Sequence, residues 1–320
     1  MRKPLPILTL TMNPAVDVSS TVTALEPYRK LRCSEVWHHP GGGGINVSRV
    51  IKRLGSETIA IFPCGGAMGA LFKRLLADEG VRQQSIPIAG DMREDFSVDE
   101  TTTGKQFRFI LPGPRLSTIE IGACVNAVAG RLRPSSFLVA SGSLPPGVPP
   151  DFYAQLARVA ANASAKFVLD SSGAPLRAAV DHGGLFLIKP SQTELAELAG
   201  RPVNGREACM EVARDIVSSR RAEFVCVSLG AEGALLVGQG CSLFADAPQV
   251  DVKTTIGAGD SLLAALVWAF AHHASPAEAL KLAVAAGAAS LLAPGTGLCS
   301  LADIQQLKAQ THVGLLERAA

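Results

Sequence analysis

The 320-residue chain has few of the features that mark membrane, exported or nucleic-acid-binding proteins. Its longest apolar runs fall short of the roughly 20 residues that a membrane-spanning helix requires. Residues 1–12 contain two prolines, and no signal-peptide cleavage site follows them. Two Trp and two Tyr are too few for the stacked aromatic rings that bind single-stranded nucleic acid. A net charge of +2 gives no general attraction to nucleic acid or anionic lipid.

Cysteine pairs with metal-binding spacing are also absent from the sequence. The seven cysteines are scattered, at Cys33, Cys64, Cys124, Cys209, Cys226, Cys241 and Cys299. This pattern predicts reduced thiols and no zinc site. Hydrophobic residues make up 48% of the chain and charged residues 18%, which suffices for a large buried core. We therefore expect a soluble, cytoplasmic enzyme.

Short apolar runs alternate with segments of helical spacing along most of the chain. The runs are rich in Val, Ile, Leu or Phe, and they lie at 7–12, 58–63, 137–141, 166–170, 185–189 and 224–229. Helical spacing is found at 67–79, 150–163, 191–200, 205–220, 258–272 and 276–292. The alternation is typical of an α/β fold, in which helices cover both faces of a mostly parallel sheet.

Two segments depart from this alternation. Residues 14–39 and 91–111 contain alternating patterns such as KQFRFIL, without adequate helices between them. Their strands are expected to pair into a small second sheet inserted into a single domain that spans 1–320. A lid over a cleft and an ordinary edge hairpin both fit the pattern.

The segment TTIGAGDS, residues 254–261, is the strongest single feature of the sequence. It leads directly into an apolar helix, and the first N–H groups of a helix attract anions. Gly257, Ala258 and Gly259 are therefore candidates to cradle a phosphoryl group that is being transferred. Asp260 is placed either to take a proton from an attacking hydroxyl or merely to cap the helix. With an ordinary pKa of about 3.9 and a helix dipole beside it, Asp260 is expected to be ionised.

A second glycine cluster, PGGGGINV at 40–47, directly precedes another helical pattern. Its glycines allow a polar ligand to approach the main chain, and Asn46 has donors and an acceptor for sugar hydroxyls. A dinucleotide site is disfavoured, because that fingerprint needs a preceding buried strand and a later acidic residue. Here WHHP precedes the glycines, and the next strand ends at Phe62-Pro63-Cys64.

Two further segments follow predicted strands, where parallel sheets bind ligands. In KPSQTE, Lys189 and Glu194 are candidates to face a nucleotide phosphate and its Mg²⁺, although Glu194 also suits a helix cap. In SLGAEG, Ser228, Gly230 and Gly233 form either a ligand loop or an ordinary tight turn.

Together these segments resemble the PfkB/ribokinase family of sugar kinases. GGGGINVSRVIKRLG and TTIGAGDSLLAAL are similar to the two signatures of the family. Other segments resemble its minor-type phosphofructokinase branch: KLRC, IFPCGGAMG, FRFILPG, SGSLPPGV, DSSG, VSLGAEGAL and GTGLCS. The resemblance extends from about Leu8 to Ser300. It implies a Rossmann-like αβα sandwich with a small β lid, and dimer formation through that lid.

The resemblance also implies a role for individual residues. Asp260 matches the catalytic base, and Gly257, Ala258 and Gly259 match the anion hole. The sugar-binding positions are Asp17, Gly42, Gly43 and Asn46, and the positions for a distal phosphate are Lys30, Arg93 and Ser143, with Arg32 nearby. The nucleotide and Mg²⁺ side comprises Lys189, Glu194, Ser228, Gly230 and Gly233. The resemblance also implies that carbonyl oxygens bind a monovalent cation such as K⁺, at Thr254, Ile256, Ser290, Ala293 and Gly295.

One position departs from the family pattern, because Ser191 stands where the family usually has Asn. The implied reaction is phosphorylation of fructose 6-phosphate at its C1 hydroxyl by MgATP, a step of glycolysis. Tagatose 6-phosphate and fructose 1-phosphate remain open as substrates. Nucleosides and ribose are disfavoured, because they would not need cations in the lid. A non-catalytic sugar-phosphate sensor is the alternative from another functional class.

Overall fold

The computed structural model describes residues 3–293, 295 and 297–316. Within these residues the strands are β1 Ile7–Leu10, β2 Ala15–Val22, β3 Val36–Gly41, β4 Thr58–Cys64, β5 Arg82–Pro87, β6 Arg93–Glu100, β7 Gln106–Ile110, β8 Phe137–Ser141, β9 Lys166–Asp170, β10 Leu185–Ile188, β11 Ala222–Ser228, β12 Gly233–Gly238, β13 Cys241–Asp246 and β14 Val313–Leu315. The helices are α1 Gly43–Arg53, α2 Gly66–Asp78, α3 Thr118–Ala129, α4 Phe152–Asn162, α5 Gly173–His182, α6 Gln192–Ala199, α7 Gly205–Ser218, α8 Ala258–Ala271, α9 Pro276–Ser290 and α10 Leu301–Gln310, with a 3₁₀ turn at Gly230–Glu232.

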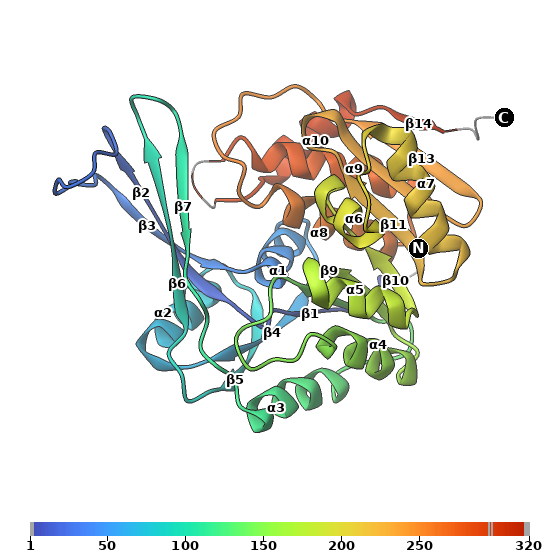
Figure 1. Ribbon diagram of the computed structural model, residues 1–320, viewed down its shortest axis with the longest axis horizontal. Helices are drawn as coiled ribbons and strands as arrows, with labels where there is room; N and C mark the ends of the chain where they lie inside the picture. The colour runs from blue at the N-terminus through green and yellow to red at the C-terminus, as the bar shows by residue number, and fades with distance from the viewer. Residues whose placement is uncertain (1–2, 294, 296, 317–320) are drawn as a thin grey trace.

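The described residues form one large sheet that matches the predicted α/β fold (Figure 1). Its strand order is β14-β13-β12-β11-β10-β9-β8-β1-β4-β5. The strands from β11 to β5 pair in parallel, whereas β12, β13 and β14 are antiparallel additions at one edge. The six predicted strands are all present, and they are buried on both faces, which explains their continuous apolar runs.

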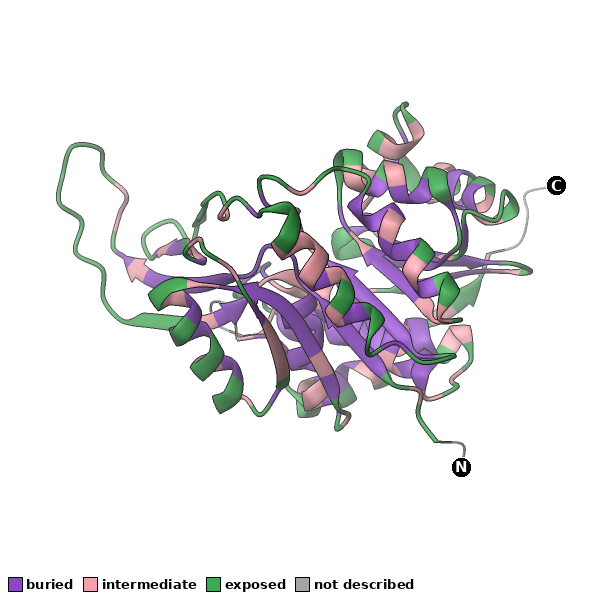
Figure 2. Ribbon diagram, turned by 90° about the horizontal axis from the view of Figure 1, so that it is seen from below, coloured by how far each residue is buried: buried purple, intermediate pink, exposed green. Residues whose placement is uncertain are grey.

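Helices cover both faces of this sheet. One core packs side chains of α3 to α7 against it, such as Tyr153 and Leu195. The other core contains α1, α8, α9 and α10, with Leu263 and Val284 fully or almost fully buried. The burial pattern in Figure 2 follows these layers, since the central strands are buried and the outer helix faces are exposed. The three-layer αβα sandwich is therefore confirmed.

The small second sheet is also present, with the order β3-β2-β6-β7. It projects from one side of the main body in Figure 1. β2 pairs in parallel with β6, so strands from the two predicted segments meet in its centre. A third core joins this sheet to α2 through Val16, Phe62 and Phe72.

The order of the main sheet creates a crevice. β1 lies between β4 and β8, so strands that follow it in the sequence are added to the sheet on both of its sides. Ligands of such sheets bind beyond the carboxyl ends of the strands, next to the point where the strand order changes direction. Asn13, Ser143, Asp170 and Lys189 follow or end β1, β8, β9 and β10, respectively. The fold therefore gathers at one edge several side chains that are distant in the sequence.

Three of the described helices were not predicted from the sequence, namely α3, α5 and α10. α3 carries apolar residues around most of its circumference, so its periodicity is weak, but the Ser117–Glu120 capping box marks its start. Ser300 is the N-cap of α10, and its hydroxyl accepts a hydrogen bond from the Asp303 amide. None of the helices in the described part of the chain is both long and apolar enough to cross a membrane.

Candidate active site

The two glycine-rich segments meet through one hydrogen bond. Asn46 Nδ2, in the first turns of α1, donates to Asp260 Oδ2, in the first turn of α8, over 2.9 Å. These residues are 214 positions apart in the sequence. Asp260 thus accepts from another helix instead of capping its own, which argues against the cap as its purpose.

Asp260 lies in a partly buried environment, which its position in the sequence did not show. Its burial raises its pKa above the ordinary value, while the Asn46 hydrogen bond and then the Lys189 charge oppose that rise. The pKa of Asp260 is therefore higher than the ordinary value assumed from the sequence, and its ionisation at neutral pH stays a prediction. A carboxylate in this environment is a stronger base than an exposed one, which suits a group that accepts a proton.

The start of α8 is shaped by glycine. Gly257 has φ of 79°, in the left-handed region, and a Cβ there would lie 2.4 Å from Leu298 Cδ2. A Cβ on Gly259 would lie 3.3 Å from Lys189 Nζ. A cation therefore lies directly against the helix start whose amides were predicted to bind an anion. Helix N–H groups and a lysine together have the chemistry to bind a phosphoryl group.

Lys189 itself forms a buried ion pair. Its Nζ lies 3.2 Å from Asp170 Oδ1, and both side chains are largely buried. Burial alone acts to lower the pKa of Lys189, but the charges of Asp170 and Asp260 raise it overall, so the ammonium stays protonated. Burial raises the pKa of Asp170 to about 6, although Lys189 opposes the rise. Asp170 was not identified as a site residue from the sequence, although its position at the end of a predicted strand is an available signal.

Asp17 lies at the inner end of the small sheet. It is 9% exposed, and a Cβ on Gly41 would lie 2.3 Å from its carboxyl carbon. Similarly, a Cβ on Gly43 would lie 2.1 Å from Ser141 Oγ. Burial, followed by the charge of Asp95, raises the pKa of Asp17 to about 7. The glycine cluster therefore brings its backbone against polar side chains, as a site for sugar hydroxyls requires.

Arg93 and Ser143 come together through Asn13. Asn13 Nδ2 donates to Ser143 Oγ over 3.1 Å, and Arg93 Nη2 donates to the Asn13 carbonyl over 3.0 Å. Arg93 Nη1 is paired with Asp95 at 2.6 Å, while Arg93 Nε is buried without a hydrogen-bond partner. Arg93 is therefore a fixed, largely buried cation, and its Nε donor has no partner among the described residues. Asn13 was not identified from the sequence, although it opens the NPAVD segment.

Lys30 and Arg32 are not brought to this cluster within the chain. They are exposed in the loop between β2 and β3, not in a strand as predicted. Asp17 pairs with His39 near the inner end of β2, whereas the loop follows Val22, about 17 Å further along the strand. The loop lies at the outer tip of the small sheet in Figure 1.

Arg108 is a cation that the sequence analysis did not single out. It lies on β7 and lines a small cavity together with Asp17, Asp95 and Ile256. Its charge also lowers the pKa values of Asp17 and Asp260, against the effect of burial. The alternating KQFRFIL pattern placed it on a strand, but only the folded sheet shows that it faces the carboxylates.

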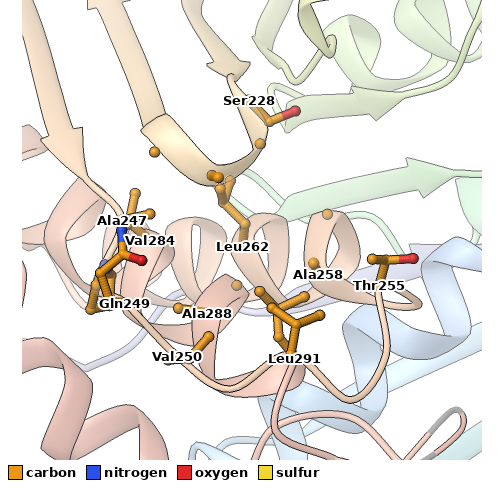
Figure 3. Close-up of a pocket in the computed structure, with 17 residues that line it drawn as sticks. Ser228, Ala247, Gln249, Val250, Thr255, Ala258, Leu262, Val284, Ala288 and Leu291 are labelled. Carbon is orange, nitrogen blue, oxygen red and sulfur yellow. The ribbon is translucent and has the colours of Figure 1, made fainter. Parts of the chain in front are cut away.

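A larger cavity of about 410 Å³ adjoins the start of α8 (Figure 3). Ser228, Gly230 and Gly233 line it at the end of β11, as do Ala258 and Gly259. The remaining lining is mostly apolar and comes from α8, α9 and the loop before α8, including Val250, Leu262, Val284 and Leu291. An apolar pocket that opens onto an anion-binding helix start suits a nucleotide, with the base in the pocket and the phosphates at the helix.

Glu194 forms a capping box with Ser191. Its Oε2 accepts from Ser191 N at 2.8 Å and from Ser191 Oγ at 2.9 Å, and the Ser191 hydroxyl accepts from Glu194 N. Ser191 and Glu194 therefore cap the start of α6, which is the helix-cap role that the sequence offered for Glu194. Glu194 also lies close enough to Asp170 to raise its pKa. The described residues contain no cluster of three or more His, Cys, Asp or Glu able to hold a metal by itself.

The segments predicted for a monovalent cation lie side by side. Lys253 N and Thr254 N both donate to the Leu291 carbonyl, just after α9. Thr254 and Ser290 are buried, whereas Gly295 lies against Ser19 of β2. Thr296, within the GTGLCS segment, lies outside the described residues. The ion itself stays a prediction.

Comparison with known proteins finds the same architecture elsewhere. Residues 5–303 match the family described as "pfkB family carbohydrate kinase". The chain is 42% identical over 301 residues to ATP-dependent 6-phosphofructokinase isozyme 2 of Mycobacterium tuberculosis, which covers 94% of this chain and 88% of that protein. It is 39% identical over 303 residues to the Escherichia coli protein of that name, with 95% and 98% covered. A 1-phosphofructokinase of Xanthomonas campestris is 33% identical over 274 residues, with 85% and 86% covered.

Solved structures agree with these matches. Phosphofructokinase-2 from E. coli in complex with fructose 6-phosphate superposes with a TM-score of 0.91 at 37% identity, covering 96% of this chain and 99% of that one. Other structures of the E. coli protein are described as a complex with potassium and as a tetrameric inhibited form.

Proposed function

The chain belongs to the pfkB family of carbohydrate kinases, and on that premise we propose that it transfers the γ-phosphoryl group of ATP to the C1 hydroxyl of fructose 6-phosphate. The observation that carries the proposal is the hydrogen bond between Asn46 and Asp260, which joins the sugar side of the site to the helix start beside Lys189. The choice of sugar is supported by 42% and 39% identity to two ATP-dependent 6-phosphofructokinases.

In the proposed reaction, Asp260 orients the C1 hydroxyl and takes its proton as the new P–O bond forms. The amides of Gly257, Ala258 and Gly259 and the ammonium of Lys189 stabilise the charge that develops on the phosphoryl oxygens. Such transfer depends mainly on alignment and on charge stabilisation. Asp17 holds sugar hydroxyls, together with the backbone at Gly42 and Gly43 and the amide of Asn46.

The distal phosphate of the sugar is proposed to bind at Arg93 and Ser143. The buried Nε of Arg93, which has no hydrogen-bond partner, supports this assignment. The apolar cavity beside Ser228, Gly230 and Gly233 would hold the nucleotide base.

The residues present fit a Mg²⁺ ion that is bound chiefly by the nucleotide. Mg²⁺ prefers oxygen ligands and commonly takes one or two carboxylates plus substrate phosphates. Glu194, through water, and the nearby Asp170 provide such oxygens. When bound, the ion would neutralise charge on the β- and γ-phosphates. K⁺ bound near Thr254 and Ser290 would be a second, structural cation.

A coupled assay of ADP release tests the proposal. The purified protein is given ATP with fructose 6-phosphate, tagatose 6-phosphate, fructose 1-phosphate, ribose or adenosine. The highest kcat/KM is expected with fructose 6-phosphate. Preference for fructose 1-phosphate would support the second candidate, which the match to 1-phosphofructokinases favours. Phosphate release without any sugar dependence would refute a sugar kinase.

We further propose that two copies associate through the small sheet. Large apolar side chains are exposed on and beside its strands: Val36, Trp37, Phe96, Phe107, Phe109, Ile110 and Leu111. Phe96, Phe107 and Phe109 share one face of the sheet, because Phe96 pairs with Phe109 and Phe107 is two residues away on β7. An exposed apolar patch of this kind marks an interaction site. Sedimentation velocity should show a dimer, and Phe109→Lys should shift it toward the monomer. The single-domain assignment for 1–320 would be supported by one cooperative unfolding transition.

A further inference from the structure

Helix α1 carries three polar side chains on one side, Asn46, Arg49 and Arg53, spaced by three and four residues. Asn46 faces Asp260, but the proposed reaction assigns nothing to Arg49. Arg49 is 1% exposed and is among the largest fully buried side chains of the described chain. A charge that is removed from water in this way needs well-oriented partners.

Arg49 has partners on both sides. Its Nε lies 2.9 and 2.8 Å from the two carboxylate oxygens of Glu79, and its Nη2 lies 2.6 Å from Glu79 Oε1. Its Nη1 donates to Asn46 Oδ1 over 3.1 Å and to the Pro40 carbonyl over 3.0 Å. Glu79, just after α2, is thus joined to Asp260 by the series Glu79, Arg49, Asn46, Asp260.

The chemistry of these groups fixes the direction of the Asn46 amide. A guanidinium group only donates hydrogen bonds, so Arg49 can bind the oxygen of the amide but not its NH₂ group. The NH₂ group is then left to face Asp260, whose ionised carboxylate only accepts. A flipped amide would place donor against donor at Arg49 and acceptor against acceptor at Asp260.

We propose that Arg49, held by Glu79, is a positioning residue that fixes the orientation of the Asn46 amide and thereby holds Asp260 as an ionised, correctly placed base. The proposal rests on the proposed function, since it takes Asp260 as the base. It predicts that Arg49 acts on catalysis chiefly through Asn46, with a smaller direct effect of its charge on Asp260.

Several charges surround Asp260, and the proposal depends on their balance. Lys189 after β10, Arg108 on β7 and Arg49 on α1 favour its ionised form. Asp170 at the end of β9 disfavours it, since the two carboxylates repel each other. The Asn46 hydrogen bond is the largest contribution that opposes the effect of burial on the pKa of Asp260. Loss of that bond should therefore move the acidic limb of kcat to higher pH.

The test replaces Arg49 and follows kcat across pH. Arg49→Met is expected to lower kcat on the order of 10- to 100-fold, a cost typical of lost supporting hydrogen bonds around functional groups, with little change in KM for ATP. The acidic limb of kcat should move to higher pH, which a merely structural defect would not cause. Lys52→Met is the matched control, because Lys52 is on the same helix but pairs with Glu57 at the surface.

Arg49→Met alone leaves the Glu79 carboxylate without Arg49 and can impair folding. The double variant Arg49→Met/Glu79→Leu removes both charges, and its circular dichroism and melting temperature check that it is folded. In an Asn46→Ala background, Arg49→Met should cause a much smaller fall in kcat and a much smaller shift of the pH limb, because only the direct effect of the Arg49 charge on Asp260 is left to lose. Additive losses, or an unmoved pH limb in the folded double variant, would overturn the proposal.

A readout without substrate separates this proposal from the proposed function. The carboxyl ¹³C signal of Asp260, assigned by its loss in Asp260→Asn, is titrated in the unmodified protein and in Arg49→Met/Glu79→Leu. A higher midpoint in the variant that is largely lost when Asn46 is also replaced by Ala supports the positioning role, even if the unmodified protein phosphorylates no sugar phosphate. An unchanged midpoint in a protein that is active on fructose 6-phosphate refutes the positioning role and leaves the function standing.

Discussion

Asp17 is expected to destabilise the folded protein at neutral and alkaline pH. It is buried beside Asp95 and against Gly41, with its pKa raised from 3.8 to about 7. Below pH 3.8 Asp17 is mostly protonated in both the folded and the unfolded state, and the free energy of unfolding has its full value. As the pH rises from 3.8 to 7, the unfolded state loses this proton more readily than the folded state, so the free energy of unfolding falls. Asp17→Asn keeps the shape of the side chain but carries no titrating proton. The variant should therefore gain stability relative to the unmodified protein as pH increases.

The magnitude follows from the shift of about three pKa units, each worth about 1.4 kcal/mol. Compared with a carboxyl that keeps its ordinary pKa in the folded state, Asp17 lowers the free energy of unfolding by about 2 kcal/mol at pH 5 and about 4 kcal/mol at pH 8. The stability difference between variant and unmodified protein should thus increase by about 2–3 kcal/mol between these pH values. Hydrogen bonds that the new amide gains or loses contribute at both pH values, so they largely cancel in this comparison.

The assay is urea-induced unfolding of both proteins at pH 5 and pH 8, followed by circular dichroism. The matched control is Asp78→Asn, the same chemical change at an exposed position at the end of α2. The reasoning is refuted if the difference in unfolding free energy between Asp17→Asn and the unmodified protein is equal at the two pH values. Activity measured in parallel should fall, since Asp17 is proposed to hold the sugar.

Three further predictions concern the reaction. Asp260→Asn should lower kcat by about 10²–10⁴, the usual contribution of a positioned base, and near-normal turnover would remove it from the mechanism. Gly43→Ala should abolish most activity, because its Cβ would lie 2.1 Å from Ser141 Oγ; an unaffected steady-state rate would contradict the tight approach. Gly287→Val should raise KM for ATP far more than KM for the sugar, because the new side chain fills part of the apolar cavity. Its control is Gly122→Val on α3, where a Cβ has no atom within 4 Å.

The sequence by itself determined the order of strands and helices and the likeness to a kinase family. Six buried strands were predictable because each is a continuous apolar run, and the two glycine segments because each directly precedes a helix. α3 was not predictable from its periodicity, since its apolar residues extend around most of the helix. Glu194 illustrates a limit, because the same residue at the same position suits both a cap and a metal site.

Only the tertiary structure decided which polar groups share one environment. The sequence positions of Asp170, Arg108 and Arg49 do not show what these side chains contact. Their partners Lys189, Asp17 and Glu79 lie on or beside other strands and helices. The raised pKa values of Asp17 and Asp260 likewise come from burial between elements that are distant in the chain. Local sequence sets the backbone conformation through nearby residues, whereas desolvation and charge pairing depend on distances that exist only once the sheet, the helices and the small sheet have packed together.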